Sequence, residues 1–398
     1  MKNTVFFPLV LAAALPAGAE EIKFPNIAAR PAPADFSFLQ SGVSTASFSF
    51  NEDSRDGFQM NFRSCDLTAF DLSASTSMSH ASFNSGTKFP ARLPPGFDPA
   101  REMELGRNPG LGVRKLHARG IDGRGVGVAI IDQALLTTHA EYADRLKFYE
   151  EIHCLDADTA SMHAPAVASL SVGKTIGVAP GASLYAIGEI NGDYGPDDKF
   201  VFNLDYVAQS IDRLVEVNRQ LPASEKIRVI SISLAMVDKW KGYDRVMESI
   251  RKARAENIFV LTVQDPAFPM DGMGRRPDLD PDDKKSYTGG TMFCGNKEGS
   301  DDRTLQVPMD SRTLADPTGD NSYYFSRIGG QSWLEPWMAG LYALACQVYP
   351  QVTPELFWSV GLETADAVKF SKGGKKYTLR KVVNPVKLIA RLEKLAGK

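Results

Sequence analysis

The sequence predicts a large α/β domain with a central, mostly parallel sheet and helices on both faces, preceded by a β-rich N-terminal extension. From about residue 100, short runs that are apolar on both faces alternate with stretches of helical spacing. Such alternation is typical of parallel strands joined by crossover helices. Before residue 100, Ser, Phe, Thr and Asn dominate and helical periodicity is weak. With 398 residues and 43% apolar composition, the chain is long enough to bury a large core.

The chain begins with a pattern typical of a secretory signal. Lys2 gives a short basic start, an apolar run extends from Val5 to Pro16, and Ala17-Gly18-Ala19 has the spacing of a cleavage site. The apolar run is shorter than the roughly 20 residues of a membrane-spanning helix, and no later stretch reaches that length. We therefore expect residues 1–19 to be removed and the product to be secreted or periplasmic, without a membrane span. An uncleaved anchor is the alternative.

Charge and cysteine content exclude several classes of protein. The formal net charge of −3 gives no basic surplus, so neither nucleic acid nor an anionic membrane is an expected partner. The four cysteines, Cys65, Cys154, Cys294 and Cys346, include no Cys-x-x-Cys pair that would suggest zinc or redox chemistry. In an oxidising compartment, four cysteines permit three pairings, and the sequence does not choose among them. For Cys346, on an apolar helix, a free buried thiol is at least as good an explanation.

Residues 20–99 form the expected extension, which ends in a Pro-rich segment from Phe89 to Pro95. Within it, Cys65 to Ala69 and Phe70 to Ala74 repeat a five-residue pattern that resembles a fragment of a pentapeptide repeat. Because a repeat architecture needs several units to bury a core, two turns of an irregular β-rich segment are the favoured interpretation.

Residues 100–398 are expected to form the α/β domain. Four runs have the composition of buried parallel strands, at residues 126–131, 183–187, 228–233 and 258–262. Helices are expected over residues 202–218 and 243–256, where apolar residues recur at helical spacing. Residues 264–326 show little regular pattern and many Gly, Pro and Asp. A loop this long is more often functional than not, so we expect it to border the substrate cleft.

Two segments place an acid and a base in the local settings that nucleophilic catalysis needs. Asp132 ends the buried strand, where ligand sites of parallel sheets open and where a shielded carboxylate pairs strongly with an imidazolium. Among the five histidines, only His163 is followed by small residues, Ala164 to Ser169, that let a helix pack tightly against a sheet. Pro165 suits the first turn of that helix. The positive end of the helix dipole would then disfavour the imidazolium and keep the base available.

A third segment supplies the nucleophile. Ser332 follows Gly329-Gly330, which allow close approach of a substrate backbone, and precedes an apolar helix. Ser332-x-x-Glu335 is also a capping box, which alone would explain the serine, and one serine can serve both roles. A serine hydroxyl needs an imidazole to take its proton and a carboxylate to orient that imidazole. The chain supplies all three groups in the order Asp, His, Ser.

These segments resemble the three signature motifs of the subtilisin-like serine peptidases (subtilases, peptidase S8), whose chain order is also Asp, His, Ser. The resemblance covers roughly residues 100–368, and Gly177-Val-Ala-Pro-Gly-Ala-Ser-Leu-Tyr185 closely matches the family's Gly-Val-Ala-Pro-x-Ala-x-Leu segment. The chain departs from the family pattern at Ala134, in place of a Gly, and at several small residues after His163. A lipase or esterase is disfavoured because Leu334 breaks the Gly-x-Ser-x-Gly elbow of those enzymes.

The resemblance implies a three-layer subtilisin-like fold and a serine endopeptidase that acts on a peptide or protein substrate. Ser332 would attack the peptide carbonyl, His163 would shuttle the proton and Asp132 would orient His163. Ser233-Leu234-Ala235 resembles the family strand that pairs with an extended substrate, with Ala235 replacing the usual Gly.

The family's oxyanion-binding Asn has no counterpart here, because the strand ends Thr262-Val263-Gln264-Asp265-Pro266. Asp265 aligns best and donates only if protonated, whereas Gln264 has the amide chemistry on a longer arm. The backbone N–H of Ser332 is a further candidate. Loss of one such donor typically costs roughly 100- to 1,000-fold in rate. The alternative function is therefore a catalytically impaired subtilisin-like fold that binds peptides or proteins.

The resemblance leaves structural calcium open, and no other cofactor is expected. Asp278-Leu-Asp280-Pro-Asp282-Asp283 spaces carboxylates like a calcium loop but lacks the EF-hand glycine. A solvated acidic loop is the favoured interpretation, so no residue is assigned as a metal ligand.

Family members commonly carry an N-terminal inhibitory segment that they remove themselves, and the Pro-rich exit near Lys88 to Pro95 offers an exposed place to cut. Residues 20–99 lack the compact α/β pattern of such a segment. Its apolar residues look suited to burial against the α/β domain, namely Phe58, Met60, Phe62, Cys65 and Leu67. We therefore favour permanent packing.

Overall fold

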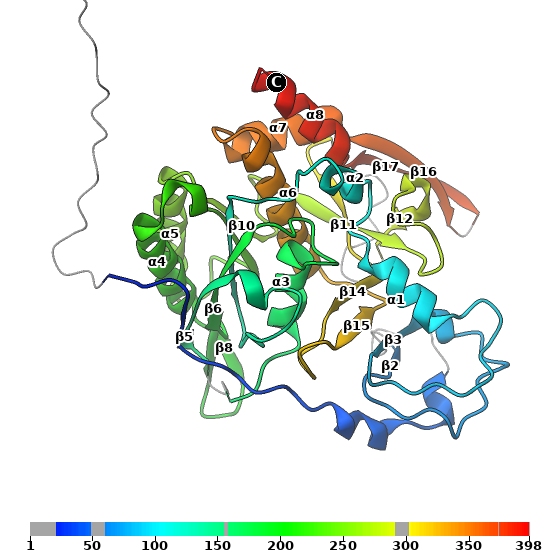
Figure 1. The fold of residues 1–398 in the computed structure, drawn as a ribbon. Helices are drawn as coiled ribbons and strands as arrows, with labels where there is room; N and C mark the ends of the chain where they lie inside the picture. Colours follow the sequence, from blue (N-terminus) through cyan, green and yellow to red (C-terminus); the bar gives the residue numbers. More distant parts are fainter. Residues whose placement is uncertain (1–20, 49–59, 155–157, 291–301, 373, 398) are drawn as a thin grey trace, which may run out of the picture.

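The main sheet of the computed structural model is six-stranded and parallel throughout (Figure 1). The structure describes residues 21–48, 60–154, 158–290, 302–372 and 374–397. The strand order is β1 (Asn26–Ile27), β5 (Leu146–His153), β6 (Ser183–Glu189), β4 (Gly127–Asp132), β9 (Ile227–Ala235) and β10 (Phe259–Val263). The four strands predicted from sequence are confirmed as β4, β6, β9 and β10. Strand β5 was missed because charged residues such as Glu150 and Glu151 interrupt its apolar pattern.

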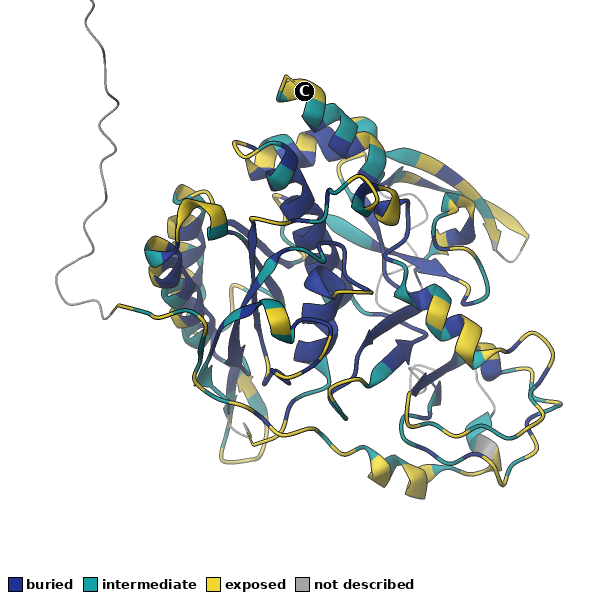
Figure 2. Ribbon diagram, in the orientation of Figure 1, coloured by how far each residue is buried: buried dark blue, intermediate teal, exposed yellow. Residues whose placement is uncertain are grey.

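Helices cover both faces of this sheet. Helices α4 (Leu204–Gln220) and α5 (Tyr243–Ala255) pack on one face, and α3 (His163–Val172) and α6 (Leu334–Val348) pack on the other. Figure 2 shows α3 and α6 as almost wholly buried, whereas α4 and α5 expose their outer sides. The predicted three-layer α/β architecture is confirmed, and the two predicted helices correspond to α4 and α5.

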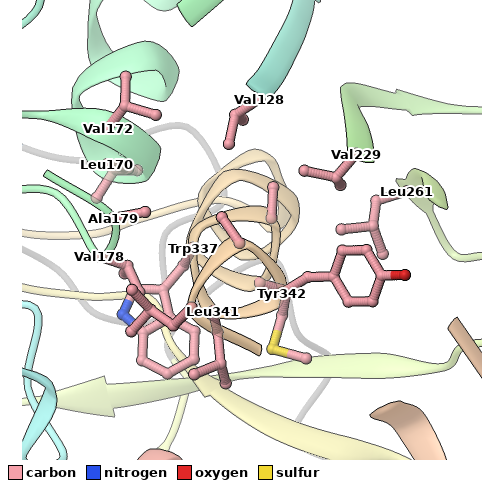
Figure 3. Close-up of a cluster of buried hydrophobic side chains, with 14 of the residues drawn as sticks. Val128, Leu170, Val172, Val178, Ala179, Val229, Leu261, Trp337, Leu341 and Tyr342 are labelled. Atoms are coloured by element: carbon pink, nitrogen blue, oxygen red, sulfur yellow. The ribbon is translucent and has the colours of Figure 1, made fainter. Parts of the chain in front are cut away.

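Helix α6 forms the centre of the larger hydrophobic core (Figure 3). Trp337, Leu341 and Tyr342 on α6 are fully buried, and side chains from three strands and from α3 surround the helix. A helix that is apolar on all sides must be enclosed, since any exposed side would leave apolar surface in water. The position of Ser332, just before α6, is therefore fixed by the core.

Small residues let α6 approach its neighbours closely. A Cβ at Gly340 would lie 2.6 Å from Cβ of Val178 and 2.9 Å from the carbonyl oxygen of Ser171. Val178 belongs to the segment that most closely matches the subtilase pattern. That segment therefore supplies the surface on which α6 rests.

Residues 264–326, expected to be irregular, contain five short strands, so that prediction was wrong. They are β11 (Met270–Arg275), β12 (Tyr287–Gly289), β13 (Leu305–Pro308), β14 (Arg312–Ala315) and β15 (Tyr323–Ser326). Strands of three to six residues are too short for a period to stand out from Gly, Pro and Asp.

The first three of these strands belong to a second sheet of order β12-β11-β13-β17-β16, which the hairpin β16 (Asp366–Lys372) and β17 (Lys375–Val382) completes. The remaining described elements are peripheral to the main sheet. They are α1 (Pro99–Arg107), α2 (Val113–His117), α7 (Pro354–Thr364), α8 (Pro385–Leu395) and the small hairpin β7 (Gly192–Tyr194) and β8 (Phe200–Phe202).

The described part of the N-terminal extension contributes strands to two of the sheets, and Ala32 also forms a bridge with Thr159. Strand β1 pairs with β5 at the edge of the main sheet. Strands β2 (Met60–Asn61) and β3 (Ala81–Asn84) join β15 and β14 in a four-stranded sheet. Met60, Phe62, Cys65 and Leu67 are buried in a separate core, as their apolar character suggested, whereas Phe58 lies outside the described residues.

The five-residue pattern of the extension corresponds to two equivalent turns. Asp66 Oδ1 accepts hydrogen bonds from the backbone and hydroxyl of Thr68, at 3.0 and 2.6 Å. Asp71 Oδ1 accepts the same pair from Ser73, at 3.0 and 2.7 Å. The leucines that follow each Asp, Leu67 and Leu72, are fully buried. The interpretation as two turns of an irregular segment is confirmed.

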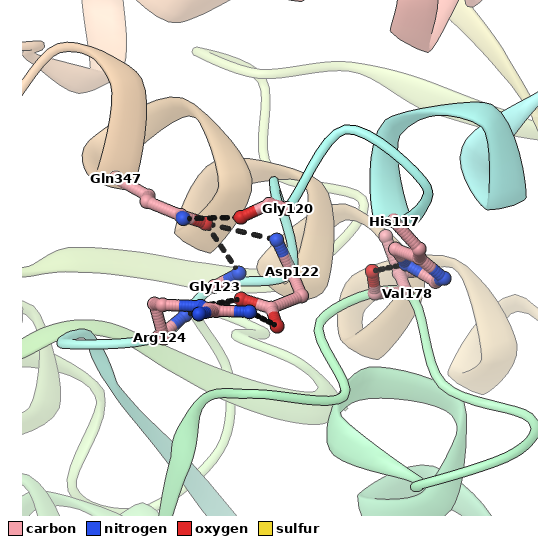
Figure 4. Close-up of polar contacts among 7 residues, drawn as sticks. All are labelled: His117, Gly120, Asp122, Gly123, Arg124, Val178 and Gln347. Atoms are coloured by element: carbon pink, nitrogen blue, oxygen red, sulfur yellow. Dashed lines mark hydrogen bonds and ion pairs between the residues drawn. The ribbon is translucent and has the colours of Figure 1, made fainter.

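At the amino ends of the strands, hydrogen bonds from α6 also hold the turn before β4 in place (Figure 4). Gln347 Oε1 accepts hydrogen bonds from the backbone N–H groups of Asp122 and Gly123, at 2.9 and 2.7 Å, and its Nε2 donates to the carbonyl of Gly120. His117 Nε2 lies 2.8 Å from the carbonyl oxygen of Val178. His117 therefore has a structural role at the end of the sheet opposite Asp132.

Cys65, Cys154 and Cys346 carry free thiols, whereas Cys294 and the signal-like residues lie outside the described part of the chain. None of the described helices is long and apolar enough to cross a membrane.

We expect Gly340→Ala to destabilise the protein by about 2 kcal/mol, because the added methyl group overpacks the contact with Val178 and Ser171. Gly361→Ala is the matched control. It also lies inside a helix, but its Cβ would meet only ends of leucine side chains, of which the nearest is Leu305 Cδ1 at 3.2 Å, so the change in stability should stay below about 1 kcal/mol. Urea denaturation of both variants measures the difference, and equal stabilities would contradict this account of α6.

Candidate active site

Asp132 and His163 are paired at the carboxyl end of β4. The Asp132 carboxylate is buried, and His163 Nδ1 lies 2.8 Å from its Oδ1 and 2.9 Å from its Oδ2. Oδ1 also accepts the backbone N–H of Gln133 at 2.8 Å. Because an ionised carboxylate only accepts hydrogen bonds, the proton of a neutral His163 must sit on Nδ1. The lone pair on Nε2 is then available as a base.

Two opposing effects set the basicity of His163, the first residue of α3. Burial lowers the pKa of the imidazole, and the charge and hydrogen bond of Asp132 raise it, with a net shift upward. The helix end was expected to keep the imidazole neutral, but Asp132 outweighs it. The pairing makes His163 a stronger base than a free histidine.

Trp333 packs beside this pair and was not singled out from the sequence. Its ring centroid lies 5.4 Å from that of His163, with an angle of 35° between the planes, and the indole is buried. The indole therefore limits the positions that the imidazole can take. The only sequence signal for this contact is that Trp333 directly follows Ser332.

Ser332 lies in a short 3-10 turn, Gln331–Trp333, that leads into α6. The capping box is not formed, because neither this turn nor α6 has a side-chain cap hydrogen bond. Glu335 is instead buried, and burial raises its pKa to about 8. Capping thus does not account for Ser332.

Ser332 and His163 line one cavity of about 420 Å³. Among the hydrogen bonds of the described residues, none joins Ser332 Oγ to His163 Nε2. The same cavity is lined by Ser233, Leu234 and Ala235, and Ser233 Oγ donates to the carbonyl oxygen of Ser332 at 3.1 Å. Two of the three residues suggested for the triad, His163 and Ser332, therefore border the same space as the suggested substrate strand, and Asp132 lies behind His163.

The substrate-strand residues lie where β9 extends past β4. The register of these two strands ends with Ile131 opposite Ile232, so Ser233 and Leu234 lie beyond the paired residues of β4. On the other side, Val263 of β10 lies opposite Ala235 across a bulge. Extended backbone without a ladder partner on one side is the feature that strand addition requires.

The two candidate oxyanion side chains point to different partners. The Asp265 carboxylate accepts hydrogen bonds from Arg254 Nη2 at 2.7 Å and from the backbone N–H of Ala267 at 2.8 Å, and Asp265 does not line the cavity. Gln264 has a left-handed backbone, with φ of 58°, and its Nε2 donates to Gln331 Oε1 at 3.3 Å. Gln331 lines the cavity beside Ser332. Of the two candidates, Gln264 is thus the one that contacts a residue lining the cavity.

The acidic segment at residues 278–283 is organised by its own hydrogen bonds. Asp278 pairs with Arg276, Asp282 Oδ1 accepts the N–H of Gly112 at 2.8 Å, and Asp283 Oδ1 accepts the N–H of Lys285 at 2.9 Å. Among the described residues, no group of three or more His, Cys, Asp or Glu side chains is arranged to hold a metal ion.

Comparison with known proteins places the fold. No family model matches the sequence. The A-subunit of the AB5 toxin from E. coli is similar, with 16% identity and a TM-score of 0.51, over 71% of this chain and 98% of that chain. The PatG macrocyclase in complex with peptide has 16% identity and a TM-score of 0.49, over 72% of this chain and 96% of that chain. The prenylagaramide maturation protease PagA has 15% identity and a TM-score of 0.48, over 71% and 98%.

The neighbours are proteins of the subtilisin-like fold, and that fold is the class to which the architecture of this chain conforms. At this level of identity the likeness to the toxin subunit shows the fold and not the reaction. The chemistry must therefore be argued from the residues of the cavity.

We expect Gln264→Ala to lower kcat for a peptide substrate by about 100-fold, because one amide donor to the oxyanion is lost. Asp265→Asn, in the same turn, should leave kcat within about twofold but lower stability by about 1 kcal/mol, because it weakens the pair with Arg254. Steady-state kinetics and urea denaturation of both variants separate the two effects. A kcat raised by Asp265→Asn would instead assign the oxyanion position to Asp265.

Proposed function

We propose that the protein is a serine endopeptidase of the subtilisin-like type, with Ser332 as nucleophile, His163 as general base and Asp132 as the residue that orients His163. The observation that carries this proposal is the contact of His163 Nδ1 with both oxygens of the buried Asp132 carboxylate, beside a cavity that Ser332 also lines. A buried carboxylate paired in this way fixes the tautomer and stabilises the imidazolium as it forms.

The reaction would follow from these positions. As Ser332 Oγ forms a bond to the peptide carbonyl carbon, His163 Nε2 takes the hydroxyl proton. The tetrahedral intermediate collapses when the C–N bond breaks, and the imidazolium gives its proton to the departing amine. Water then attacks the acyl-enzyme, His163 takes a proton from that water, and the carboxylic acid leaves as the Ser332 hydroxyl is restored.

The substrate would bind as an extended strand beside Ser233, Leu234 and Ala235. The backbone of these residues supplies hydrogen bonds to any peptide sequence, and the cavity takes one side chain. Among the residues that line the cavity, His163 is the only one that can carry a charge, so the pocket favours uncharged side chains.

Substitution of the triad tests the proposal. Ser332→Ala and His163→Ala should each lower kcat by at least about 10,000-fold, and the double variant should lose less than about tenfold more, because the groups act as one unit. Ser183→Ala, at the start of β6 and the opposite end of the sheet, is the control and should keep full activity. Peptide hydrolysis that is equal in wild type and Ser332→Ala would refute the assignment.

The second candidate is a catalytically impaired fold that binds peptides. Two observations favour it: the chain lacks the Asn expected after β10, and among the described residues no hydrogen bond joins Ser332 Oγ to His163 Nε2. A fluorophosphonate separates the candidates, since only an activated serine reacts with it. Labelling of wild type but not of Ser332→Ala supports the peptidase. Peptide binding without labelling supports the binding protein.

We also propose that the protein is secreted or periplasmic and that residues 20–99 stay attached in the active form. The burial of Met60, Phe62 and Leu67 in a core of the extension supports this, because separation would expose apolar surface. Mass spectrometry of the secreted protein should find an amino terminus near Glu20 in wild type and in Ser332→Ala. A terminus near residue 95 in wild type alone would show self-processing and contradict the proposal.

A further inference from the structure

A second cavity lies between the extension and the α/β domain. Its volume is about 630 Å³, and it is lined by residues 73–76, 78–80 and 94–97 of the extension, by Glu102 on α1, by residues 276–278 and by Arg327. Figure 1 shows the extension beside α1 and β15, where these segments meet. None of these residues belongs to the cavity of His163 and Ser332. This second cavity is called the rear cavity below.

Among the described residues, the rear cavity contains one buried carboxyl oxygen without a hydrogen-bond partner, Oε2 of Glu102. Glu102 is 3% exposed. A buried carboxyl oxygen that is left unpaired costs free energy of roughly 1–3 kcal/mol or more, and most such atoms in proteins are paired. Glu102 thus offers a strong acceptor to any donor that enters the cavity.

Positive charge also lines the same cavity. Arg327 is 9% exposed, and its Nε donates to the carbonyl oxygen of Ser79 at 2.7 Å, which ties the guanidinium to the extension. Arg276 also lines the cavity and pairs with Asp278 at 2.7 Å. The walls therefore present both signs of charge, together with hydroxyl groups of the extension and apolar surface from Met78 and Phe97.

From these observations we propose that the rear cavity binds a small zwitterion, a free amino acid or a short peptide. Its ammonium group donates to Glu102 Oε2, and its carboxylate faces the guanidinium of Arg327. A ligand with a single charge would complement only one of these groups, and a hydrocarbon ligand would leave Glu102 unpaired.

Because Glu102 can ionise, binding of the zwitterion should release a proton. Burial raises its pKa to about 8, so the carboxyl group is mostly protonated at pH 7. An ammonium group beside it stabilises the ionised form and lowers the pKa, so that binding at pH 7 releases up to about one proton to the buffer. The other charged groups that act on Glu102 are Arg327, Asp278, Asp98 and Arg275, and His80 lines the same cavity.

The rear cavity shares a wall with the candidate active site. Ser326 and Ile328 line the cavity of His163 and Ser332, whereas Arg327, between them in the chain, lines the rear cavity. The same chain segment continues to Gly329, whose backbone N–H donates to Asp310 Oδ1 at 2.9 Å, and then reaches Ser332. A ligand that fixes Arg327 would thus fix the segment before the nucleophile. This coupling rests on the proposed function, whereas the binding itself does not.

Calorimetric titration of the full-length protein tests the binding, with L-leucine as the probe. Leucinamide, which keeps the ammonium alone, and N-acetyl-leucine, which keeps the carboxylate alone, should each bind at least about tenfold more weakly than leucine. Glu102→Gln should weaken the binding of leucine by a similar factor. It should also abolish the proton release, which is measured by titration in buffers of different ionisation enthalpy. Glu104→Gln is the matched control, because Glu104 lies exposed on the same helix, and it should bind as wild type does.

Absence of heat with leucine up to about 10 mM would overturn the site, as would equal binding by wild type and a folded Glu102→Gln protein. Equal affinities for leucine and leucinamide would overturn the role of Arg327. The coupling is tested by peptide hydrolysis with and without leucine, and leucine should change the rate in wild type but not in Glu102→Gln. Binding without a rate change overturns the coupling alone. If wild type hydrolyses no peptide, the proposed function fails while the titration still decides the site.

Discussion

The burial of one carboxylate, that of Asp132, constrains the arrangement around it. A charge at the end of a central strand costs several kcal/mol in lost hydration unless a partner compensates for it. His163 supplies that partner through Nδ1 to both carboxylate oxygens. The first residue of α3 must therefore lie over the end of β4. This requirement fixes where α3 begins, and the contact of Trp333 with the imidazole ties the start of α6 to the same point.

Close packing of the helices makes the region around Asp132 and His163 rigid. Helices α3 and α6 lie on the same face of the sheet, and small side chains on both allow their backbones to approach. The absence of a side chain at Gly340 lets α6 rest on Val178 and Ser171. Because α6 is enclosed by the core, Ser332 cannot move away from His163 without disturbing the packing of Trp337 and Tyr342. The positions of Ser332 and His163 are thus set by the packing of α3 and α6 in the core.

The sequence predicted those parts of the molecule whose pattern is long and regular. Strands β4, β6, β9 and β10 are apolar on both faces, and α4 and α5 have a clear helical period. Local pattern could not reveal β5, because charged residues interrupt its apolar run. Nor could it reveal the short strands between Gln264 and Arg327. It also could not show that Asp265 would find Arg254, eleven residues earlier on α5, because that pairing depends on how α5 packs beside β10. Motifs located Asp132, His163 and Ser332, but the contact of Trp333 with His163 required the fold.

The extension has the contacts of a structural part of the domain more than those of a removable inhibitor. An inhibitor that occupies a cleft must contact the catalytic groups, yet the described residues of the extension do not line the cavity of His163 and Ser332. They add β1 to an open sheet edge and β3 to β15, where Phe83 stacks on Phe325 with centroids 5.1 Å apart. Each large apolar side chain exposed by separation would cost about 1.5–3 kcal/mol. Since β15 leads directly into the wall at residues 326–330, the extension supports the active-site wall from behind.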